Sequence, residues 1–428
     1  MTTELHEARR LLAEGDIAGS VQAVRHAVNF AAEPPPLPDL AAVLADLAAA
    51  ADFEDLATAA RAVRDAPADT GALTVLGYEC VEYGLSFAAI PVLREALRVG
   101  PPTRQALNEL ATAFEDEYRH GEAVEVLTRY EPMLEPWPDR YLLVYNAILA
   151  ADLPRARAEF DRLPEPDEDW RFPRDRVAGM LARADRAQPV TALDQQDLRG
   201  WHFVLTGGYL ATLSPFGFDA GMTGRWAYFG DSTQSCRHGL DRLALILSAS
   251  GRRPRSISLL PGRSNRILGL AAAELFGLPA EPFAPDTTDT VVIAYDLDDL
   301  DDDLAHALRE RTAGQILYEH ATCWTRPPRV SADVTGLLHQ MIVEPWGPGL
   351  RIGADGSPEQ TPADERPEAE IAAEIARADG APDPGDGQTP PDPDTALAAF
   401  VAGTRDNWLG GPRTPMRSPG PVRSSSFL

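Results

Sequence analysis

The chain has 428 residues, of which 44% are hydrophobic, and its formal net charge is −26 at pH 7. This length allows two or three domains with real cores, and the acidic charge argues against nucleic acid as a partner because it repels a phosphate backbone. The first residues, MTTELHEARR, lack the apolar region of a signal peptide, and no run approaches the ~20 apolar residues of a membrane span. We therefore expect a cytoplasmic protein without a membrane partner.

All 39 basic residues are arginine, because the sequence contains no lysine. A Schiff-base enzyme, a Walker-type phosphate loop and a kinase-like nucleotide site each need a lysine amine, so the composition argues against all three. A chain without lysine and rich in Ala, Arg, Pro and Gly is typical of a high-GC bacterial genome. The cysteines Cys80, Cys236 and Cys323 lie far apart, which predicts reduced thiols rather than a disulfide framework.

Helical segments rich in Ala and Leu follow one another from Glu4 to about Leu163, with breaks at Gly, Pro and Asp residues. An apolar pattern within this region recurs after 34 residues, which indicates a structural repeat. Its first two copies are Leu73, Leu76, Cys80, Ala89 and Leu93, then Leu107, Leu110, Phe114, Ala123 and Leu127. A third copy begins with Tyr141, Val144 and Ile148.

This pattern, with Gly77, Ala96 and Pro101 at matching places, resembles the tetratricopeptide repeat family. The resemblance implies a solenoid of four or five helix pairs over residues 1–165, in which small residues such as Gly77 let paired helices approach closely. It also implies a concave face that binds a protein or peptide partner. The alternative is an ordinary helical bundle without a binding role.

Residues 166–197 are predicted as a capping helix and a linker, with Trp170 and Phe172 covering the exposed end of the last repeat. Residues 198–350 alternate β-rich runs with helical segments, which predicts an α/β domain with a mostly parallel sheet covered on both faces. The expected strands are 201–205, paired with 209–213, and then 257–260, 291–295 and 315–319. The expected helices are 235–248, 267–276, 300–311 and 332–341.

Residues 351–428 are rich in Pro, Gly, Asp and Glu, a composition typical of disorder. We expect a mostly disordered acidic tail there. Two short apolar helices, at 368–377 and 395–402, are predicted to interrupt it, and Trp408 is a candidate contact point.

A short apolar strand ending at Leu260, a break at Pro261 and an Ala-rich helix form a strand, loop and helix unit, and ligands of parallel α/β domains bind at such loops. A glycine permits close approach of the backbone, the helix offers free N–H groups, and two arginines can hold an anion. The candidate anion-binding residues are Gly262, Arg263, Ser264, Asn265 and Arg266. The alternative is an arginine-rich surface loop without a ligand.

The sequences LLPGRSNRILGLAAAELFGLP and VVIAYDLDD resemble the type I phosphoribosyltransferase fold over a limited part of the chain. The resemblance implies a ligand that contains phosphate. In that family the second motif continues into a Thr and Gly loop that holds a 5-phosphate, whereas five aspartates stand in this part of the chain. They are Asp298, Asp299, Asp301, Asp302 and Asp303. Their charges repel phosphate, which argues against transfer in the family's manner.

The same aspartates suit the N-terminus of the following helix, because acidic groups interact favourably with its dipole. Helix capping is therefore the preferred interpretation. The alternative is a magnesium site built from Asp296, Asp298 and Asp299.

Two Cys and His pairs, Cys236 with His238 and His320 with Cys323, have the donor types of one tetrahedral zinc site. Core packing of the cysteines is the preferred interpretation, and a Cys nucleophile activated by His is a further alternative. We therefore expect no cofactor, with zinc and magnesium as the alternatives.

Together these features favour a cytoplasmic bacterial adaptor or scaffold that binds a protein partner through its repeats. Its α/β domain would be non-catalytic or would sense an anionic, phosphate-containing ligand. The competing hypothesis is an enzyme that acts on a phosphorylated nucleoside or sugar. The lack of a Thr and Gly phosphate loop after Asp296 favours the adaptor.

Overall fold

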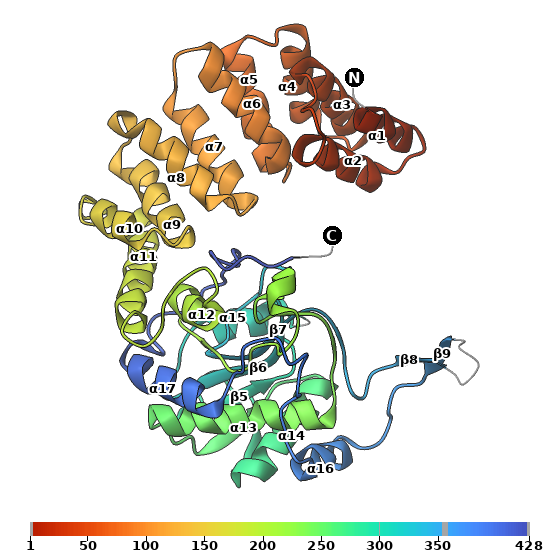
Figure 1. Ribbon diagram of the computed structural model, residues 1–428, viewed down its shortest axis with the longest axis vertical. Coiled ribbons are helices and arrows are strands. Elements are labelled where there is room, and N and C mark those ends of the chain that lie inside the picture. Colours follow the sequence, from red (N-terminus) through yellow and green to blue (C-terminus); the bar gives the residue numbers. More distant parts are fainter. Residues whose placement is uncertain (1–2, 299, 353–357, 426–428) are drawn as a thin grey trace. The chain divides into compact units, whose positions relative to one another are not determined.

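The computed structural model of the protein describes residues 3–298, 300–352 and 358–425. The chain forms two compact units, which divide between Val177 and Ala178. Figure 1 labels the elements of both units. Among the described residues, no helix combines the length and the apolar character needed to cross a membrane.

The first unit consists of helices that pack against each other in pairs (Figure 1). The pairs are α1 (Thr3–Ala13) with α2 (Ile17–Asn29), α3 (Leu37–Ala50) with α4 (Glu54–Asp65), α5 (Thr70–Glu82) with α6 (Ser86–Val99), α7 (Arg104–Asp116) with α8 (His120–Arg129), and α9 (Tyr141–Leu149) with α10 (Leu153–Phe160). Two short helical segments precede α9, namely η1 (Glu131–Met133) and η2 (Pro136–Arg140). Residues 3–160 thus form five helix pairs.

The 34-residue period is visible in the helices themselves, because α5 and α7 begin and end 34 residues apart. The apolar positions of the repeat, such as Leu76 and Leu110, are buried. At Gly77 an added Cβ atom would lie 2.3 Å from the side chain of Leu93, so only glycine lets α5 and α6 approach this closely. The predicted helices and their register are confirmed here, while membership of the tetratricopeptide repeat family stays a resemblance.

The predicted capping segment is a single helix, α11 (Glu168–Ala187), which crosses the boundary between the two units. The ring centroid of Trp170 lies 5.7 Å from those of Trp137 and Tyr141. Trp170 therefore packs on the last helix pair, as expected. Phe172 is 52% exposed and does not share this role.

The second unit is built on a parallel sheet. Its strands are β1 (Tyr209–Leu210), β2 (Trp226–Gly230), β3 (Ser256–Leu259), β4 (Ala280–Pro282), β5 (Thr290–Ala294), β6 (Ile316–Cys323) and β7 (Val334–Val343). Their order is β1-β7-β6-β5-β3-β4. Strand β2 pairs with the same edge of β7 as β1 does, further along β7. After β3 the chain continues to β4, which lies next to β3 on one side. After β5 it continues to β6, which lies next to β5 on the opposite side. The carboxyl ends of β3 and β5 therefore form a topological switch point, where α/β domains bind ligands.

Helices cover both faces of this sheet, as predicted. Ile293 and Tyr318 are register partners on one face, where they lie against α14 (Arg263–Phe276) and α13 (Thr233–Ser250), respectively. On the other face, α15 (Asp302–Arg309) packs its buried side chains against Val292 and Leu317. A separate antiparallel hairpin joins β8 (Gly349–Ile352) to β9 (Pro358–Thr361), and a short segment, η3 (Phe218–Met222), precedes β2.

The strand predicted at 201–205 is wrong, because these residues lie in α12 (Leu198–Thr206). The side chain of Asp197 caps this helix by accepting a hydrogen bond from a backbone N–H, and Gly207 ends it in the left-handed conformation with φ 78°. Aromatic and β-branched residues suggested a strand, but both ends of the segment carried helix signals. The following strand, β1, pairs with β7 instead.

The helix predicted at 332–341 is also wrong, because these residues lie mainly in β7. This strand lies between β6 on one side and β1 and β2 on the other. Its first six residues are buried, so the apolar run lacks the alternation of a half-buried strand. At Gly336 an added Cβ atom would lie 2.3 Å from the carbonyl oxygen of His320, which explains the glycine in this strand.

The tail predicted to be mostly disordered is ordered over its described residues 358–425. The two predicted helices are confirmed as α16 (Glu368–Arg377) and α17 (Asp394–Thr404), which the short helix η4 (Arg405–Asn407) follows. Arg413 is fully buried and Trp408 is 4% exposed. The residues at 353–357 and 426–428 lie outside the described part of the chain.

Buried ion pairs explain why composition misled the prediction for this tail. Asp392 lies 2.7 Å from the guanidinium groups of both Arg199 and Arg242. Arg413 lies 2.8 Å from Asp333, and both side chains are fully buried. Charged residues that usually favour disorder therefore anchor the tail to the sheet domain.

Candidate functional site

The predicted strand, loop and helix unit is present at the switch point of the sheet. β3 ends at Leu259, α14 begins at Arg263, and Gly262 between them has φ 94°, a conformation that favours glycine. The loop therefore lies where a ligand of this fold class is expected.

The two arginines of this loop are bonded to the chain's own segment after β9. Arg263 donates from Nη2 to the carbonyl oxygens of Asp364 and Arg366, at 2.6 and 2.8 Å. Arg266 donates from Nε to the carboxylate of Glu368 at 2.7 Å. An anion at this loop would have to displace these partners, so the anion site stays a prediction.

The other two polar side chains of the loop are also bonded within the chain. Asn265 accepts a hydrogen bond from the backbone N–H of Tyr295 at 2.8 Å, which ties the β3 loop to the end of β5. Ser264 donates to Glu344 and accepts from the indole N–H of Trp346, both at 2.9 Å. These bonds stabilise the switch point as a closed, hydrogen-bonded structure.

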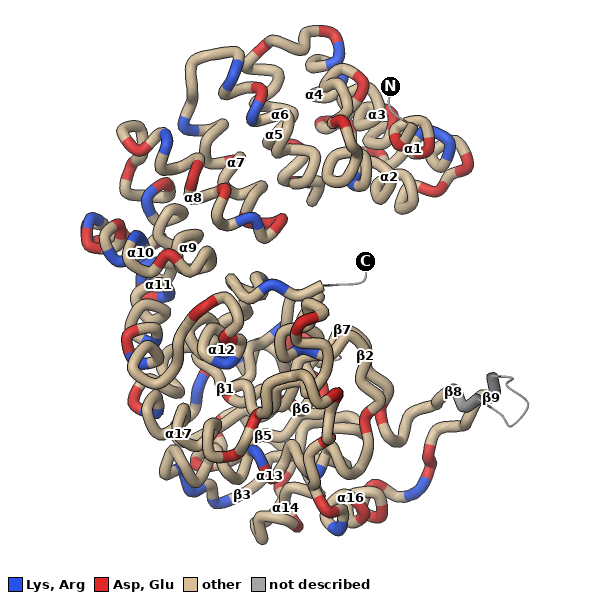
Figure 2. The backbone as a smooth tube through the Cα atoms, in the orientation of Figure 1, with Lys and Arg blue, Asp and Glu red and all other residues tan. Residues whose placement is uncertain are grey.

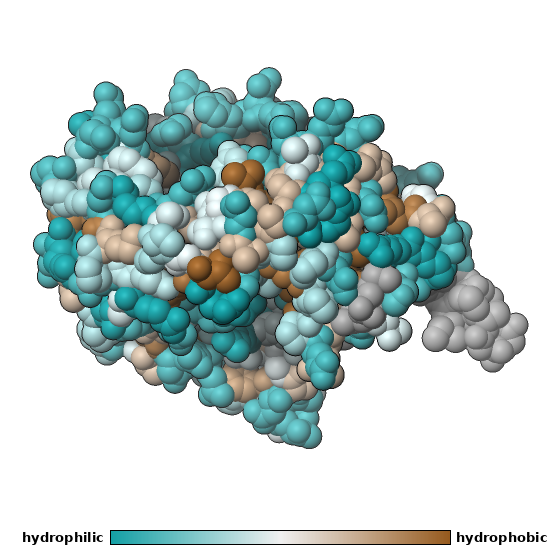
Figure 3. All heavy atoms as spheres, turned by 90° about the horizontal axis from the view of Figure 1, so that it is seen from above, coloured by the Kyte–Doolittle hydropathy of each residue, from teal (hydrophilic) through white to brown (hydrophobic). Residues whose placement is uncertain are grey.

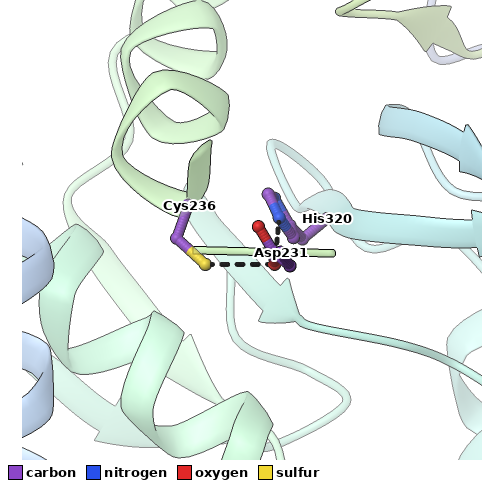
Figure 4. A group of neighbouring side chains, drawn as sticks. All are labelled: Asp231, Cys236 and His320. Atoms are coloured by element: carbon purple, nitrogen blue, oxygen red, sulfur yellow. Dashed lines mark hydrogen bonds and ion pairs between the residues drawn. The ribbon is translucent and has the colours of Figure 1, made fainter. Parts of the chain in front are cut away.

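The two Cys and His pairs meet only in part. Cys236 of α13 and His320 of β6 converge on Asp231, which follows β2 (Figure 4). His238 instead lies 3.0 Å from the carbonyl oxygen of Gly380, and Cys323 lies 3.6 Å from a carbonyl oxygen of β7. The expected set of two Cys and two His ligands is therefore not assembled. The cluster that forms consists of Asp231, Cys236 and His320.

Asp231 is the centre of this cluster. Its Oδ2 accepts hydrogen bonds from Cys236 Sγ at 3.3 Å, from the Tyr295 hydroxyl at 2.8 Å and from His320 Nε2 at 3.0 Å. Its side chain is fully buried, and burial acts to raise its pKa. The neighbouring His320 and the hydroxyl groups of Ser235 and Tyr295 outweigh burial, so the pKa of Asp231 lies below its usual value. Asp231 is therefore a carboxylate at neutral pH.

This geometry does not support a Cys nucleophile activated by His. Burial, and then the charge of Asp231, raise the pKa of Cys236 well above its usual value, so the sulfur is a thiol at neutral pH. The imidazole directs Nε2 to Asp231, and its Nδ1 lies 3.2 Å from the Tyr318 hydroxyl. An imidazole that activates the Cys236 thiol would have to direct a nitrogen atom toward the sulfur.

The same three side chains have the donor set of a zinc site, because the three ligand atoms lie within 4.8 Å of one another. Three protein ligands that leave a fourth position open are typical of catalytic zinc. Each group is also satisfied by hydrogen bonds without a metal. Zinc at this cluster therefore stays a hypothesis.

The acidic run after β5 is divided between capping and ion pairing. Asp301 caps α15 through its side chain, as expected for an acidic residue at a helix N-terminus. Asp298 lies 3.0 Å from Arg326, and Asp296 accepts a hydrogen bond from the backbone N–H of Asp298 at 2.7 Å. Asp299, the third member of the suggested magnesium site, lies outside the described residues.

Asp231 and Tyr295 were missed from the sequence. Asp231 follows the aromatic run of β2, which was not predicted as a strand, so nothing placed it at the carboxyl edge of the sheet. The sequence did offer one signal for Asp231, because it is a polar residue between an apolar run and Ser232, which caps the next helix.

A second candidate site lies on the first unit, where α5 and α7 are neighbours. Val75 and Tyr78 of α5 are 49% and 37% exposed. The charge of Glu82, then burial and the charges of Glu79 and Glu109 raise the pKa of Tyr78. Burial, and then the charge of Glu82, raise the pKa of Glu109. These shifts indicate carboxylates crowded without counter-charge.

These residues form what we call the acidic face: Val75, Tyr78, Glu79, Glu82 and Glu109. Within the described residues, none of its three carboxylates makes an ion pair. Figure 2 shows acidic residues along the helices of the first unit. The view from above in Figure 3 shows that the surface is mainly hydrophilic, with small apolar groups between the hydrophilic residues.

No family model matches the sequence, and no curated protein matches it either.

Proposed function

We propose that this protein is a cytoplasmic bacterial adaptor that binds a protein partner through its helix pairs. The acidic face is the observation that carries this proposal. An exposed tyrosine beside uncompensated carboxylates offers apolar contact area together with negative potential. The partner that suits this face is a basic peptide segment.

The arrangement of the helices supports this proposal. α5 and α7 are the first helices of successive pairs, so their outer surfaces form one continuous face. The resemblance to tetratricopeptide repeats implies peptide binding at such a face. The competing enzyme hypothesis has weaker support, because the loop arginines are bonded within the chain and Asp298 stands where a phosphate loop would be.

The test uses the full chain and an array of arginine-rich and lysine-rich 15-residue peptides, with shuffled acidic peptides for comparison. Wild-type protein is expected to bind a subset of basic peptides, less tightly at high salt. Tyr78→Ala and the double variant Glu82→Arg, Glu109→Arg should each weaken binding about tenfold or more, as expected for residues at the centre of an interface.

The matched control is Glu125→Arg, which reverses an exposed carboxylate on α8, away from the acidic face. It should bind the same peptides as wild type. Equal binding by all variants, or no binding of any basic peptide, would contradict the proposal. Circular dichroism melting confirms that each variant is folded.

A further inference from the structure

The cluster of Asp231, Cys236 and His320 joins three separate parts of the second unit. Asp231 follows β2, Cys236 lies in the first turn of α13 and His320 lies in β6. The side chains of Asp231 and His320 are 0% and 1% exposed, and Cys236 is fully buried. Ser232 and Gln234 beside the cluster are exposed, so solvent lies close to it. The fold thus gathers one oxygen, one sulfur and one nitrogen donor at a buried point just below the surface (Figure 4).

Hydrogen bonds alone place more donors on the Asp231 carboxylate than it can accept. Its Oδ1 accepts from the backbone N–H of Ser232 and from the hydroxyl of Ser235, both at 2.7 Å. Its Oδ2 faces three further donors, which are Cys236, Tyr295 and His320. A carboxylate offers about four lone-pair sites, two on each oxygen, so one donor at Oδ2 is in excess.

The buried charge of Asp231 also has no strong counter-charge. Among the described residues Asp231 pairs with no arginine, and its one ion-pair partner is the imidazole of His320. Burial of a charge is costly unless the charge is paired or coordinates a metal. A cation between the three side chains would therefore stabilise the cluster.

The spacing of the three donor atoms is close to that of a tetrahedral zinc site. Zinc bonds of about 2.0–2.3 Å at tetrahedral angles place the ligand atoms about 3.3–3.6 Å apart. Oδ2 of Asp231 lies 3.3 Å from Cys236 Sγ and 3.0 Å from His320 Nε2, and all three atoms lie within 4.8 Å of one another. Small shifts of these side chains would seat an ion between them.

The surroundings of His320 hold its Nε2 toward the cluster. Its Nδ1 lies 3.2 Å from the Tyr318 hydroxyl, and histidines that bind a metal usually bond through their other ring nitrogen in this way. Gly239 of α13 leaves room for the imidazole, since a Cβ atom added there would lie 2.8 Å from Nδ1. The ring is therefore positioned before a metal binds.

We propose that Asp231, Cys236 and His320 bind one zinc ion through Oδ2, Sγ and Nε2. The Cys236 thiol releases its proton to the solvent on binding, and His320 keeps a proton on Nδ1. The ion then occupies one position on Oδ2 and the Tyr295 hydroxyl the other, which removes the excess donor. The carboxylate and the thiolate balance the two positive charges of the ion.

The mixture of donors selects zinc among the common divalent ions. A thiolate and an imidazole suit zinc, whereas magnesium takes oxygen ligands. Three protein ligands leave a fourth tetrahedral position, which water fills in sites of this kind.

The test is metal binding by the full chain after removal of metals with a chelator. Cobalt(II) takes zinc sites, and its bond to a thiolate adds a charge-transfer absorption in the near ultraviolet. We expect one Co²⁺ per chain with this absorption, displaced by Zn²⁺ but not by excess Mg²⁺. Competition with a chromogenic chelator should give a zinc Kd below about 10 µM. A weaker Kd, or cobalt binding without the thiolate absorption, would overturn the proposal.

Variants locate the ion. Cys236→Ser should remove the thiolate absorption, and Asp231→Asn should keep it but weaken zinc binding at least about tenfold, since changes in the outer shell of a metal site alone cost about 10–100-fold. Cys323→Ser and His238→Gln are the matched controls, because both residues lie outside the cluster, and they should bind like wild type.

Circular dichroism melting shows whether each variant is folded, and the wild-type measurement decides the proposal even where a variant is not. Thiolate absorption that persists in folded Cys236→Ser, or that disappears in folded Cys323→Ser, would place the ion elsewhere and overturn the proposal.

Discussion

The helix pairs of residues 70–129 and the tail of residues 358–425 are both ordered, but different contacts stabilise them. In the helix pairs, buried side chains such as Leu76 and Leu93 contact neighbours within one or two repeats. The tail also buries apolar side chains, such as Ile375 and Val401, but its buried ion pairs join Asp392 and Arg413 to partners that lie 80 to 193 residues away in the sequence. A periodic sequence predicts the first kind of order, whereas no local pattern predicts the second.

This comparison predicts that one buried charge matters at least as much to the stability of the tail as any single leucine does to that of the helix pairs. Asp333 accepts hydrogen bonds from Arg413 and Arg311 and from the backbone N–H of Leu317. Asp333→Asn should lower the free energy of unfolding by about 3–5 kcal/mol, because it leaves the buried guanidinium group of Arg413 and the half-buried one of Arg311 without a carboxylate. Denaturant unfolding measures this change.

The control for this variant is Arg405→Met, which removes an exposed arginine of the tail. It should change the free energy of unfolding by less than about 0.5 kcal/mol. A loss below 1 kcal/mol for Asp333→Asn would mean that the ion pairs do not hold the tail.

Leu76→Ala or Leu110→Ala should destabilise the helix pairs by about 2–5 kcal/mol, since both side chains are buried. Thermal melting of a fragment covering residues 1–188, which we expect to fold independently, measures the effect. Val75→Ala, at an exposed position of the same helix, should change stability little. Similar losses for Val75→Ala and Leu76→Ala would show that the repeat register is wrong.

A smaller, graded effect is expected with pH. Burial acts to raise the pKa of Asp333, but the charges of Arg311 and Arg413 outweigh it, and the pKa lies below its usual value. A carboxylate with a lowered pKa stabilises the fold fully above its unfolded pKa of about 3.9, and this contribution is lost as pH falls through the folded pKa.

Proteolytic release of the tail should therefore be constant from pH 7 to about pH 5 and rise below about pH 4. Asp333→Asn should show a weaker pH dependence. A rise in cleavage on going from pH 5 to pH 7 would contradict this assignment.

Local signals allowed much of the fold to be predicted. The 34-residue period placed α5 to α8, and the apolar run with Pro261 and Gly262 placed β3 and α14. The failures occurred where tertiary context decided the structure. β7 is buried between strands on both sides, and Trp201 and Phe203 of α12 belong to residue types that favour strands.

The site was less predictable than the fold for the same reason. Cys236 and His320 were recognised as candidate ligands, but their common partner, Asp231, directly follows β2, a strand that was not predicted from the sequence. The arginines of the loop at Gly262 were recognised, but their partners come from the tail segment that composition predicted to be disordered. Parallel strands bring distant residues to one edge of the sheet, and only the topology shows which ones meet.

The most direct test compares amide hydrogen exchange of wild-type protein and Asp333→Asn. Contacts between neighbouring repeats hold the helix pairs, whereas the tail depends in addition on ion pairs with distant partners, so the variant should lose protection in α17 and in residues 405–425. Protection in α5 to α8 should stay as in wild type. Equal loss of protection in both regions, or unchanged protection in the tail, would contradict the difference between the two regions.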